Sequence, residues 1–116
     1  MKRLLVVVNQ SPYQNNHVAE LFDEALVAAV FEFEVSVLFL GEGTWCLQPN
    51  QRSDTLGVRS IENMMKGFET YDITNVFVCN DSISSRHIEN PVINATSVPP
   101  TQIYKLLQQQ DFVVTI

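Results

Sequence analysis

The sequence predicts an α/β fold, a three-layer α/β/α sandwich built on a mostly parallel sheet of about five strands. Apolar, β-prone runs recur along the chain, and such runs are typical of strands buried on both faces of a parallel sheet. Segments with helical spacing separate these runs, and this alternation favours parallel pairing with helices on both faces of the sheet. The chain has 116 residues, enough for a single domain over residues 1–116 and too few for two.

The first strand is expected at Leu4 to Val8, which reads LLVVV, and a turn-rich loop follows it. The stretch from His17 to Phe31 then has the spacing of an amphipathic helix, and either Asn15 or Asn16 is placed to cap its start. The apolar face of this helix comprises Val18, Leu21, Phe22, Ala25, Leu26, Ala29 and Val30. These two elements form the first β-α unit.

The middle of the chain repeats this order. A second buried strand is expected at Val35 to Leu40, and Gly41 ends it. Residues 41–51, GEGTWCLQPNQ, are rich in turn-forming residues and are expected to form a loop. A second helix follows, with Asp54 as a candidate cap. Its apolar face comprises Val58, Ile61, Met64, Met65 and Phe68.

The third strand, NVFVC, ends at Cys79, and the polar stretch 80–91 is expected to be a loop. Residues 92–93 are a candidate for a short fourth strand. Two prolines at 99–100 suit the first turn of a helix that runs to about Gln110, with Ser97 as a candidate cap. FVVTI, residues 112–116, is the last expected strand.

Composition excludes several classes of protein. The net charge is −6 and the pI is near 4.7, so a broad face that binds nucleic acid directly is not expected. No apolar stretch approaches the length of a membrane span, and the apolar run near the N-terminus is too short for a signal peptide. Two cysteines do not make a disulfide framework, and a cytoplasmic, reducing setting is the expectation.

Common ligand motifs do not occur in the loops that follow the strands. Neither GxxxxGK[ST] nor GxGxxG occurs, and Glu42 within the lone Gly-x-Gly would repel a phosphate. A flavodoxin-like module and a phospho-receiver are disfavoured by the residues at the strand ends. The possible metal ligands, His17, Cys46, Cys79 and His87, lack the spacing of a zinc site, and both histidines are expected at the surface. No cofactor and no metal are expected.

Cys79 is the candidate chemical residue, because it ends a central strand just before a polar loop, where function gathers in open α/β sheets. If Asp81 or Ser82 caps a helical turn, backbone N–H groups would stabilise a thiolate, and Arg86 would add to this if the loop folds back. The Asp81 charge opposes it, and no histidine or lysine is placed as a base. The residues alone favour a buried strand-end cysteine over a working thiol.

Trp45 in the second loop has two interpretations of equal weight. It is either an aromatic anchor for a partner or a lid folded back on the core. The neighbouring Cys46 is expected to be a small apolar filler. No Cys-x-x-Cys is present, so a thioredoxin-type dithiol is excluded.

The order of segments resembles the TusC/DsrF family of small DsrE-, DsrF- and DsrH-like sulfur-relay subunits. The resemblance covers essentially the whole chain. Two steps are similar to the family pattern, Leu47-x-Pro49-x-Gln51 and the Tyr-Asp-Ile of residues 71–73 ahead of a strand that ends in cysteine. The other segments are the opening MKRLLVVV, Ser11-Pro12 before the first helix, LFLGEGTWCLQPNQ, YDITNVFVCNDSISSR and DFVVTI.

This resemblance implies a mainly structural, TusC-like subunit of a heterohexameric sulfurtransferase complex. Its partners would be TusB/DsrH-like and TusD/DsrE-like sister subunits, and the complex would pass persulfide sulfur toward 2-thiouridine at the tRNA wobble position. A DsrF-like role in sulfur oxidation is the related alternative. In the family the main persulfide cysteine lies on the DsrE/TusD-like chain. The acceptor role is therefore not transferred to Cys79, although direct sulfur carriage through it stays open.

Three hydrophobic residues are interface candidates under this resemblance. Trp45, Leu47 and Phe68 are expected to be exposed on the isolated chain and to become buried against sister subunits. An enzymatic activity of the chain by itself is left open.

Overall fold

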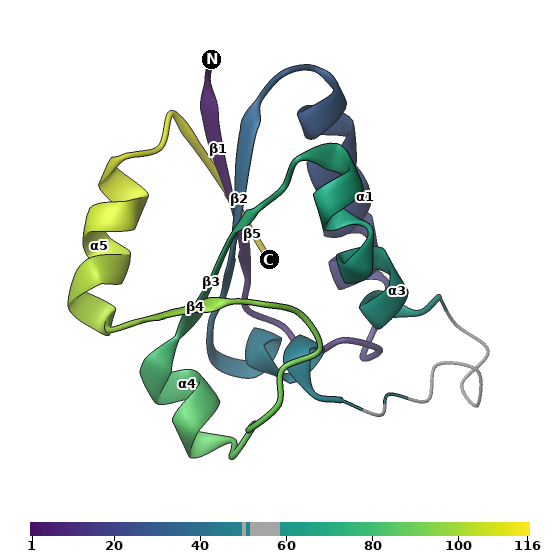
Figure 1. Cartoon of the computed structure of the whole chain (residues 1–116), viewed down its shortest axis with the longest axis vertical. Coiled ribbons are helices and arrows are strands. Elements are labelled where there is room, and N and C mark those ends of the chain that lie inside the picture. The colour runs from purple at the N-terminus through teal and green to yellow at the C-terminus, as the bar shows by residue number, and fades with distance from the viewer. Residues whose placement is uncertain (50, 52–58) are drawn as a thin grey trace.

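The computed structural model describes residues 1–49, 51 and 59–116, and they form a five-stranded sheet with helices on both faces (Figure 1). All four strand pairings are parallel, and the spatial order is β4-β3-β2-β1-β5. Helices α1 and α3 cover one face and α5 covers the other. The predicted α/β sandwich is confirmed, and its strand order is added by the structure.

The elements follow the expected alternation. The strands are β1 (Arg3–Val8), β2 (Glu34–Phe39), β3 (Asn75–Cys79), β4 (Thr96–Val98) and β5 (Phe112–Thr115). The α-helices are α1 (His17–Val30), α3 (Ile61–Lys66), α4 (Asn80–Ser85) and α5 (Pro100–Gln108). Two 3₁₀ helices, η1 (Gly41–Leu47) and η2 (Phe68–Tyr71), complete the described elements.

Helix α1 begins where the sequence predicts. Asn16 is its N-cap residue, and the Asn15 side chain accepts a hydrogen bond of 2.8 Å from the His17 backbone N–H. Four residues of the predicted apolar face are buried, Val18, Leu21, Phe22 and Ala25, whereas Val30, which the pattern also placed on this face, is 62% exposed at the end of the helix. For α3, the Ser60 side chain accepts from the Asn63 N–H at 3.1 Å and so caps the helix. Asp54 and Val58, which the sequence assigned to this helix, lie outside the described residues.

Several expectations for the second half of the chain are wrong. The stretch after Cys79 is not all loop, because its first six residues form α4. The fourth strand is Thr96–Val98 rather than residues 92–93, since Val92 donates its backbone N–H to the Leu47 carbonyl at 3.0 Å instead of pairing with β3. Ser97 lies within β4, so it does not cap α5; the N-cap residue is Pro99.

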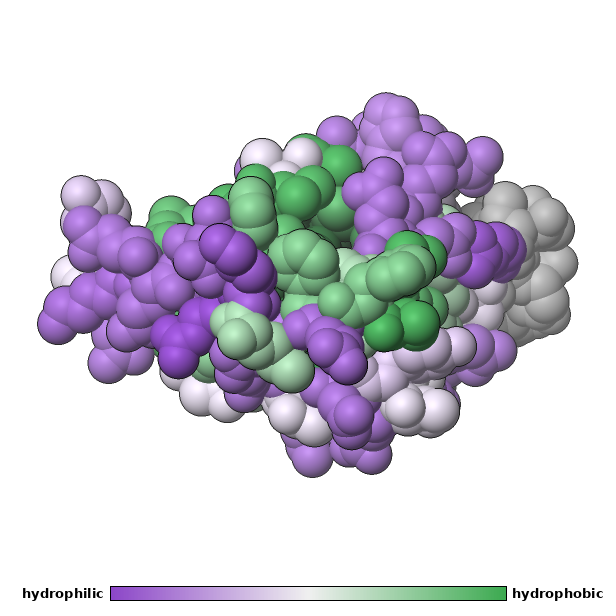
Figure 2. Space-filling view, turned by 90° about the horizontal axis from the view of Figure 1, so that it is seen from above, coloured by the Kyte–Doolittle hydropathy of each residue, from purple (hydrophilic) through white to green (hydrophobic). Residues whose placement is uncertain are grey.

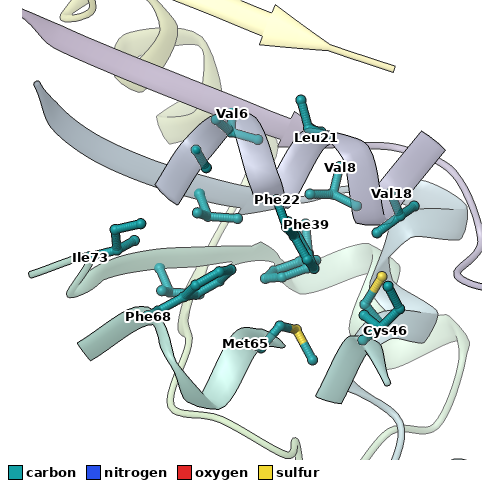
Figure 3. Close-up of a cluster of buried hydrophobic side chains, with 14 of the residues drawn as sticks. Val6, Val8, Val18, Leu21, Phe22, Phe39, Cys46, Met65, Phe68 and Ile73 are labelled. Atoms are coloured by element: carbon teal, nitrogen blue, oxygen red, sulfur yellow. The ribbon is translucent and has the colours of Figure 1, made fainter. Parts of the chain in front are cut away.

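The main core lies between the sheet and the α1–α3 layer (Figure 3). The Phe22 ring meets Phe68 and Phe39 edge-on, with centroids 5.2 and 6.4 Å apart. Edge-to-face pairs of this kind add to the free energy of burial. The opposite face has a smaller core of Leu5, Val7, Leu38 and Val98 under α5. In contrast to α1, helix α5 has no buried residue of its own.

Some large apolar side chains are exposed on the surface of the folded chain. A view from the amino ends of the strands shows a band of apolar side chains between polar borders (Figure 2). The exposed large hydrophobic residues among those described include Phe31 at the end of α1 and Phe112, Val113 and Val114 in β5. Within the described residues no helix is both long and apolar enough to cross a lipid bilayer.

Candidate functional site

The carboxyl ends of β1, β2 and β3 meet at one edge of the sheet, because neighbouring strands are parallel. The chain leaves β2 directly into η1 and leaves β3 directly into α4. These two short helices pack against each other (Figure 1). Two segments far apart in the sequence, residues 41–47 and 80–85, are thereby joined at one edge, and Cys79 lies there at the end of β3.

Cys79 is the last residue of β3 and the N-cap residue of α4. Its Cα is paired with Val98 of the neighbouring strand, and only 4% of its surface is exposed. It has no disulfide partner. The structure therefore places the thiol where the sequence predicted, at a strand end, and leaves it almost covered by its own chain.

Helix η1 lies so close to β1 that only glycine fits at one position. A Cβ on Gly43 would lie 1.8 Å from the Val8 carbonyl oxygen, far inside contact distance. Gly41 has a left-handed φ of +55°, and its N–H donates to the Ser82 Oγ at 3.0 Å. The two glycines thus fix η1 against the end of β1 and against α4.

An ion pair closes the edge between η1 and α4. Arg86 Nη2 donates to Glu42 at 2.6 Å, while Nη1 donates to the Ser82 carbonyl and to Ser85 Oγ, both at 3.2 Å. The Ser11 hydroxyl donates to the other Glu42 oxygen at 3.5 Å. The Arg86 hydrogen bond is the main reason that the pKa of the Glu42 carboxyl is lowered, so it stays ionised and paired near neutral pH.

Trp45 lies beneath this pair. The Arg86 guanidinium carbon is 6.0 Å from the indole centroid, a cation–π distance. The indole itself is half-buried. It is thus held by its own chain on one side and retains some exposed surface, so it combines features of the lid and of the anchor that the sequence left open.

The other two interface candidates are corrected by the structure. Leu47 and Phe68 are buried in the main core, with exposures of 0% and 2%. Leu47 ends η1, whose backbone turns it inward, and Phe68 packs on Phe22. Neither residue is available to a partner in this conformation, because the apolar interior of the chain has already taken both.

Cys46 is a filler, as predicted. It is fully buried in the main core beside Val18 and Met65 (Figure 3). Burial raises the pKa of its thiol to about 12, because the apolar surroundings disfavour a thiolate. Both histidines are exposed, as predicted. In the part of the chain that the structure describes, no cluster of three His, Cys, Asp or Glu side chains is placed to hold a metal ion.

Sequence reasoning missed the Glu42–Arg86 pair and the role of Ser82. Their signal was present as charges of opposite sign in the segments that follow adjacent strands. Only the strand order, which makes β2 and β3 neighbours, turns that signal into a contact. Chemically, this edge holds a buried thiol at the end of β3, and it also holds an arginine that is paired with Glu42 and lies over the Trp45 ring.

Comparison with known proteins gives the family and the fold of the chain. The model of the DsrE/DsrF-like family matches residues 2–116. A curated relative, the TusC homolog of Vibrio parahaemolyticus serotype O3:K6 (strain RIMD 2210633), is 29% identical over 111 residues, which is 94% of each chain. The crystal structure of the ychN protein from E. coli superposes over 100% of both chains with a TM-score of 0.87, at 13% identity, and so shows the same fold.

Proposed function

The chain belongs to the DsrE/DsrF-like family, and on that premise we propose that it is a largely structural subunit of a sulfur-relay complex. The observation that carries the structural role is the state of Cys79, which is 4% exposed at an edge closed by the Glu42–Arg86 pair. A thiol that receives sulfur must meet the sulfur atom of another protein. A covered thiol suits a subunit that shapes a site around a partner's cysteine.

The finer proposal is a TusC-like subunit. The similarity to a TusC homolog over 94% of both chains supports it. The partners would be a TusD/DsrE-like chain that carries the persulfide and a TusB/DsrH-like chain, two copies of each in a cytoplasmic heterohexamer. The sulfur would move on toward 2-thiouridine at the wobble position of tRNA. With a net charge of −6, this chain would leave contact with tRNA to other proteins.

Direct sulfur carriage by Cys79 is the second candidate. The position of the thiol at the carboxyl end of a central strand favours it. In that reaction the Cys79 thiolate would attack the outer sulfur of a donor persulfide. The donor S–S bond would break, the donor would leave as a thiolate, and Cys79 would become the new persulfide. The edge formed by η1 and α4 would have to open first.

Persulfide trapping separates the two candidates. The chain is co-expressed with its DsrE-like and DsrH-like sister chains, the complex is loaded with polysulfide, and alkylated peptides are read by mass spectrometry. We expect persulfide on a sister chain in wild type and in Cys79→Ser alike. Cys46→Ser is the matched control, because the buried Cys46 thiol with its pKa near 12 stays unloaded.

A persulfide found on Cys79, with loss of transfer in Cys79→Ser, would overturn the structural role. The DsrF-like alternative, in sulfur oxidation, differs in the destination of the sulfur. Liquid chromatography of tRNA nucleosides from a deletion strain decides it. Loss of 2-thiouridine is expected, and an unchanged level would contradict the tRNA role.

A further inference from the structure

One surface of the chain remains unused by the site described above. It consists of Val27 on α1, of Phe31, the C-cap residue of α1, and of Phe112 and Val114 on β5, and we call these four residues the β5 flank. Their exposed fractions are 56%, 72%, 50% and 37% respectively. A contiguous patch of exposed apolar side chains marks a site of interaction with another molecule.

The four residues lie along two elements that are neighbours. Val27 and Phe31 are one helical turn apart, and Glu20 and Glu24 continue the same stripe toward the start of α1. Val114 shares a shallow hollow with Leu21 and Glu24, so β5 lies beside this side of α1.

Phe112 points to the same side of the sheet as Val114. Its Cα pairs with Leu4 and that of Val114 with Val6, and both partners contact the α1 layer. The Phe112 ring meets Phe33 edge-on, with centroids 6.0 Å apart. Phe33 follows α1, so this contact extends the flank along the end of the helix.

Strand β5 also offers an open edge. It pairs only with β1 in the described sheet, so its outer backbone groups have no strand beside them. The other outer strand, β4, has three residues, two of them Thr96 and Ser97, and a proline follows it directly. Short length, polar side chains and proline protect an outer strand from unwanted pairing. β5 has no proline or charged residue, and three of its four residues, Phe112, Val113 and Val114, are apolar.

Charge on the flank argues against a second copy of the chain as its occupant. A twofold dimer that crosses α1 on α1 would place Glu20 and Glu24 of one copy on the apolar end of the other. Burying carboxylates against apolar side chains is unfavourable. Each copy also carries a net charge of −6. The flank instead fits a different chain with an apolar patch and basic residues placed opposite Glu20 and Glu24.

We propose that the β5 flank is the docking surface for a sister subunit of the sulfur-relay complex, which meets it with an apolar face bordered by Lys or Arg. This inference rests on the proposed function for the identity of the partner. It assigns to that partner a surface on the α1–β5 side, away from the edge that holds Cys79.

Native mass spectrometry and titration test the docking surface. The chain is co-expressed and purified with its DsrE-like and DsrH-like sister chains, and affinity is measured between purified subunits. Phe31→Asp and Glu24→Lys are the variants, because both side chains are exposed. Tyr104→Asp is the matched control for the aromatic change, since Tyr104 is 65% exposed on α5 and outside the flank. Glu69→Lys, on η2, is the control for the charge change.

We expect Phe31→Asp to weaken assembly at least tenfold and Glu24→Lys to weaken it several-fold, with both controls unchanged. A benzoylphenylalanine photo-crosslinker at position 31 is expected to capture a sister chain, while one at position 104 is not. Circular dichroism of each variant checks that the chain stays folded.

The outcomes separate the two proposals. If wild-type subunits form no complex, the proposed function fails and the partner named here fails with it. If they assemble and Phe31→Asp and Glu24→Lys bind as tightly as wild type, the function stands and the docking surface is wrong. A homodimer of the chain alone that Phe31→Asp abolishes would show that a second copy occupies the flank, which also overturns the proposal.

Discussion

The carboxyl edge of the sheet and the β5 flank are opposite in construction. At the carboxyl edge the main polar contacts are made within the chain: Arg86 bridges Glu42, Ser82 and Ser85, and Cys79 is only 4% exposed. At the β5 flank, Phe31 and Phe112 keep half or more of their surface in water. The side chains at the edge make their contacts within the chain, whereas those of the flank remain exposed to solvent.

This difference indicates where the chain depends on other proteins. Groups at the closed edge contribute to the free energy of folding of the single chain, because their contacts form when it folds. The most exposed group on the flank, Phe31, contributes little to folding, because 72% of its surface stays in water in the folded monomer. Substitutions at the two places should therefore affect different measurements, and three variants test this from the largest expected effect to the smallest.

Gly43→Ala should break the closed edge. Its Cβ would lie 1.8 Å from the Val8 carbonyl oxygen, a backbone atom that cannot rotate away. We expect a loss of about 3 kcal/mol in the free energy of unfolding, measured by urea titration.

Gly67→Ala is the control for this change. Its Cβ would lie 3.3 Å from the Met64 carbonyl oxygen, and its φ of −80° suits any residue. We expect an effect within about 1 kcal/mol. Equal losses for the two variants would contradict the close approach of η1 to β1.

Arg86→Ala should loosen the edge without dismantling it. The variant loses the hydrogen bonds to Glu42 and Ser82 and the contact with Trp45, for about 1–2 kcal/mol of unfolding free energy. Fluorescence of Trp45 reports on this place directly, because it is the only tryptophan. Arg86→Lys keeps the charge but loses the forked geometry of the guanidinium. Its free energy of unfolding should therefore lie between those of wild type and Arg86→Ala.

The pH dependence of this variant has a definite sign. The pKa of Glu42 is lowered in the folded chain, chiefly by the Arg86 hydrogen bond. The contribution of the pair is therefore present above the ordinary Glu pKa of 4.5 and is lost as pH falls through the lower folded value. The stability difference between wild type and Arg86→Ala should shrink over that range. A constant difference would mean that the ion pair contributes nothing.

Phe31→Asp should have the smallest effect on folding. The side chain is 72% exposed, so we expect the free energy of unfolding to change by less than about 0.5 kcal/mol. Urea titration of the purified monomer measures it. A large loss would show that the flank belongs to the core of the chain, and the contrast between the two regions would then disappear.

The candidate site could be foreseen only in part. The placement of Cys79 at a strand end followed from the apolar run before it, and the interior position of Cys46 followed from its apolar neighbours. Leu47 and Phe68 show the limit of such reasoning, because an apolar residue in or near a loop suits an interface and a core equally well. Their burial depends on the main core that α1, α3 and β2 enclose.

The sequence by itself determined four of the five strands, the long first helix and the alternation that makes the sheet parallel, because the spacing of apolar residues is a pattern among residues close in the chain. The tertiary structure decided the strand order, and with it that β2 and β3 bring Glu42 to Arg86 while β5 is left at an open edge. It also turned the polar residues 80–85 into a helix, whose buried Ser82 accepts from Gly41. These features depend on contacts between segments far apart in the sequence, which local patterns of residues do not encode.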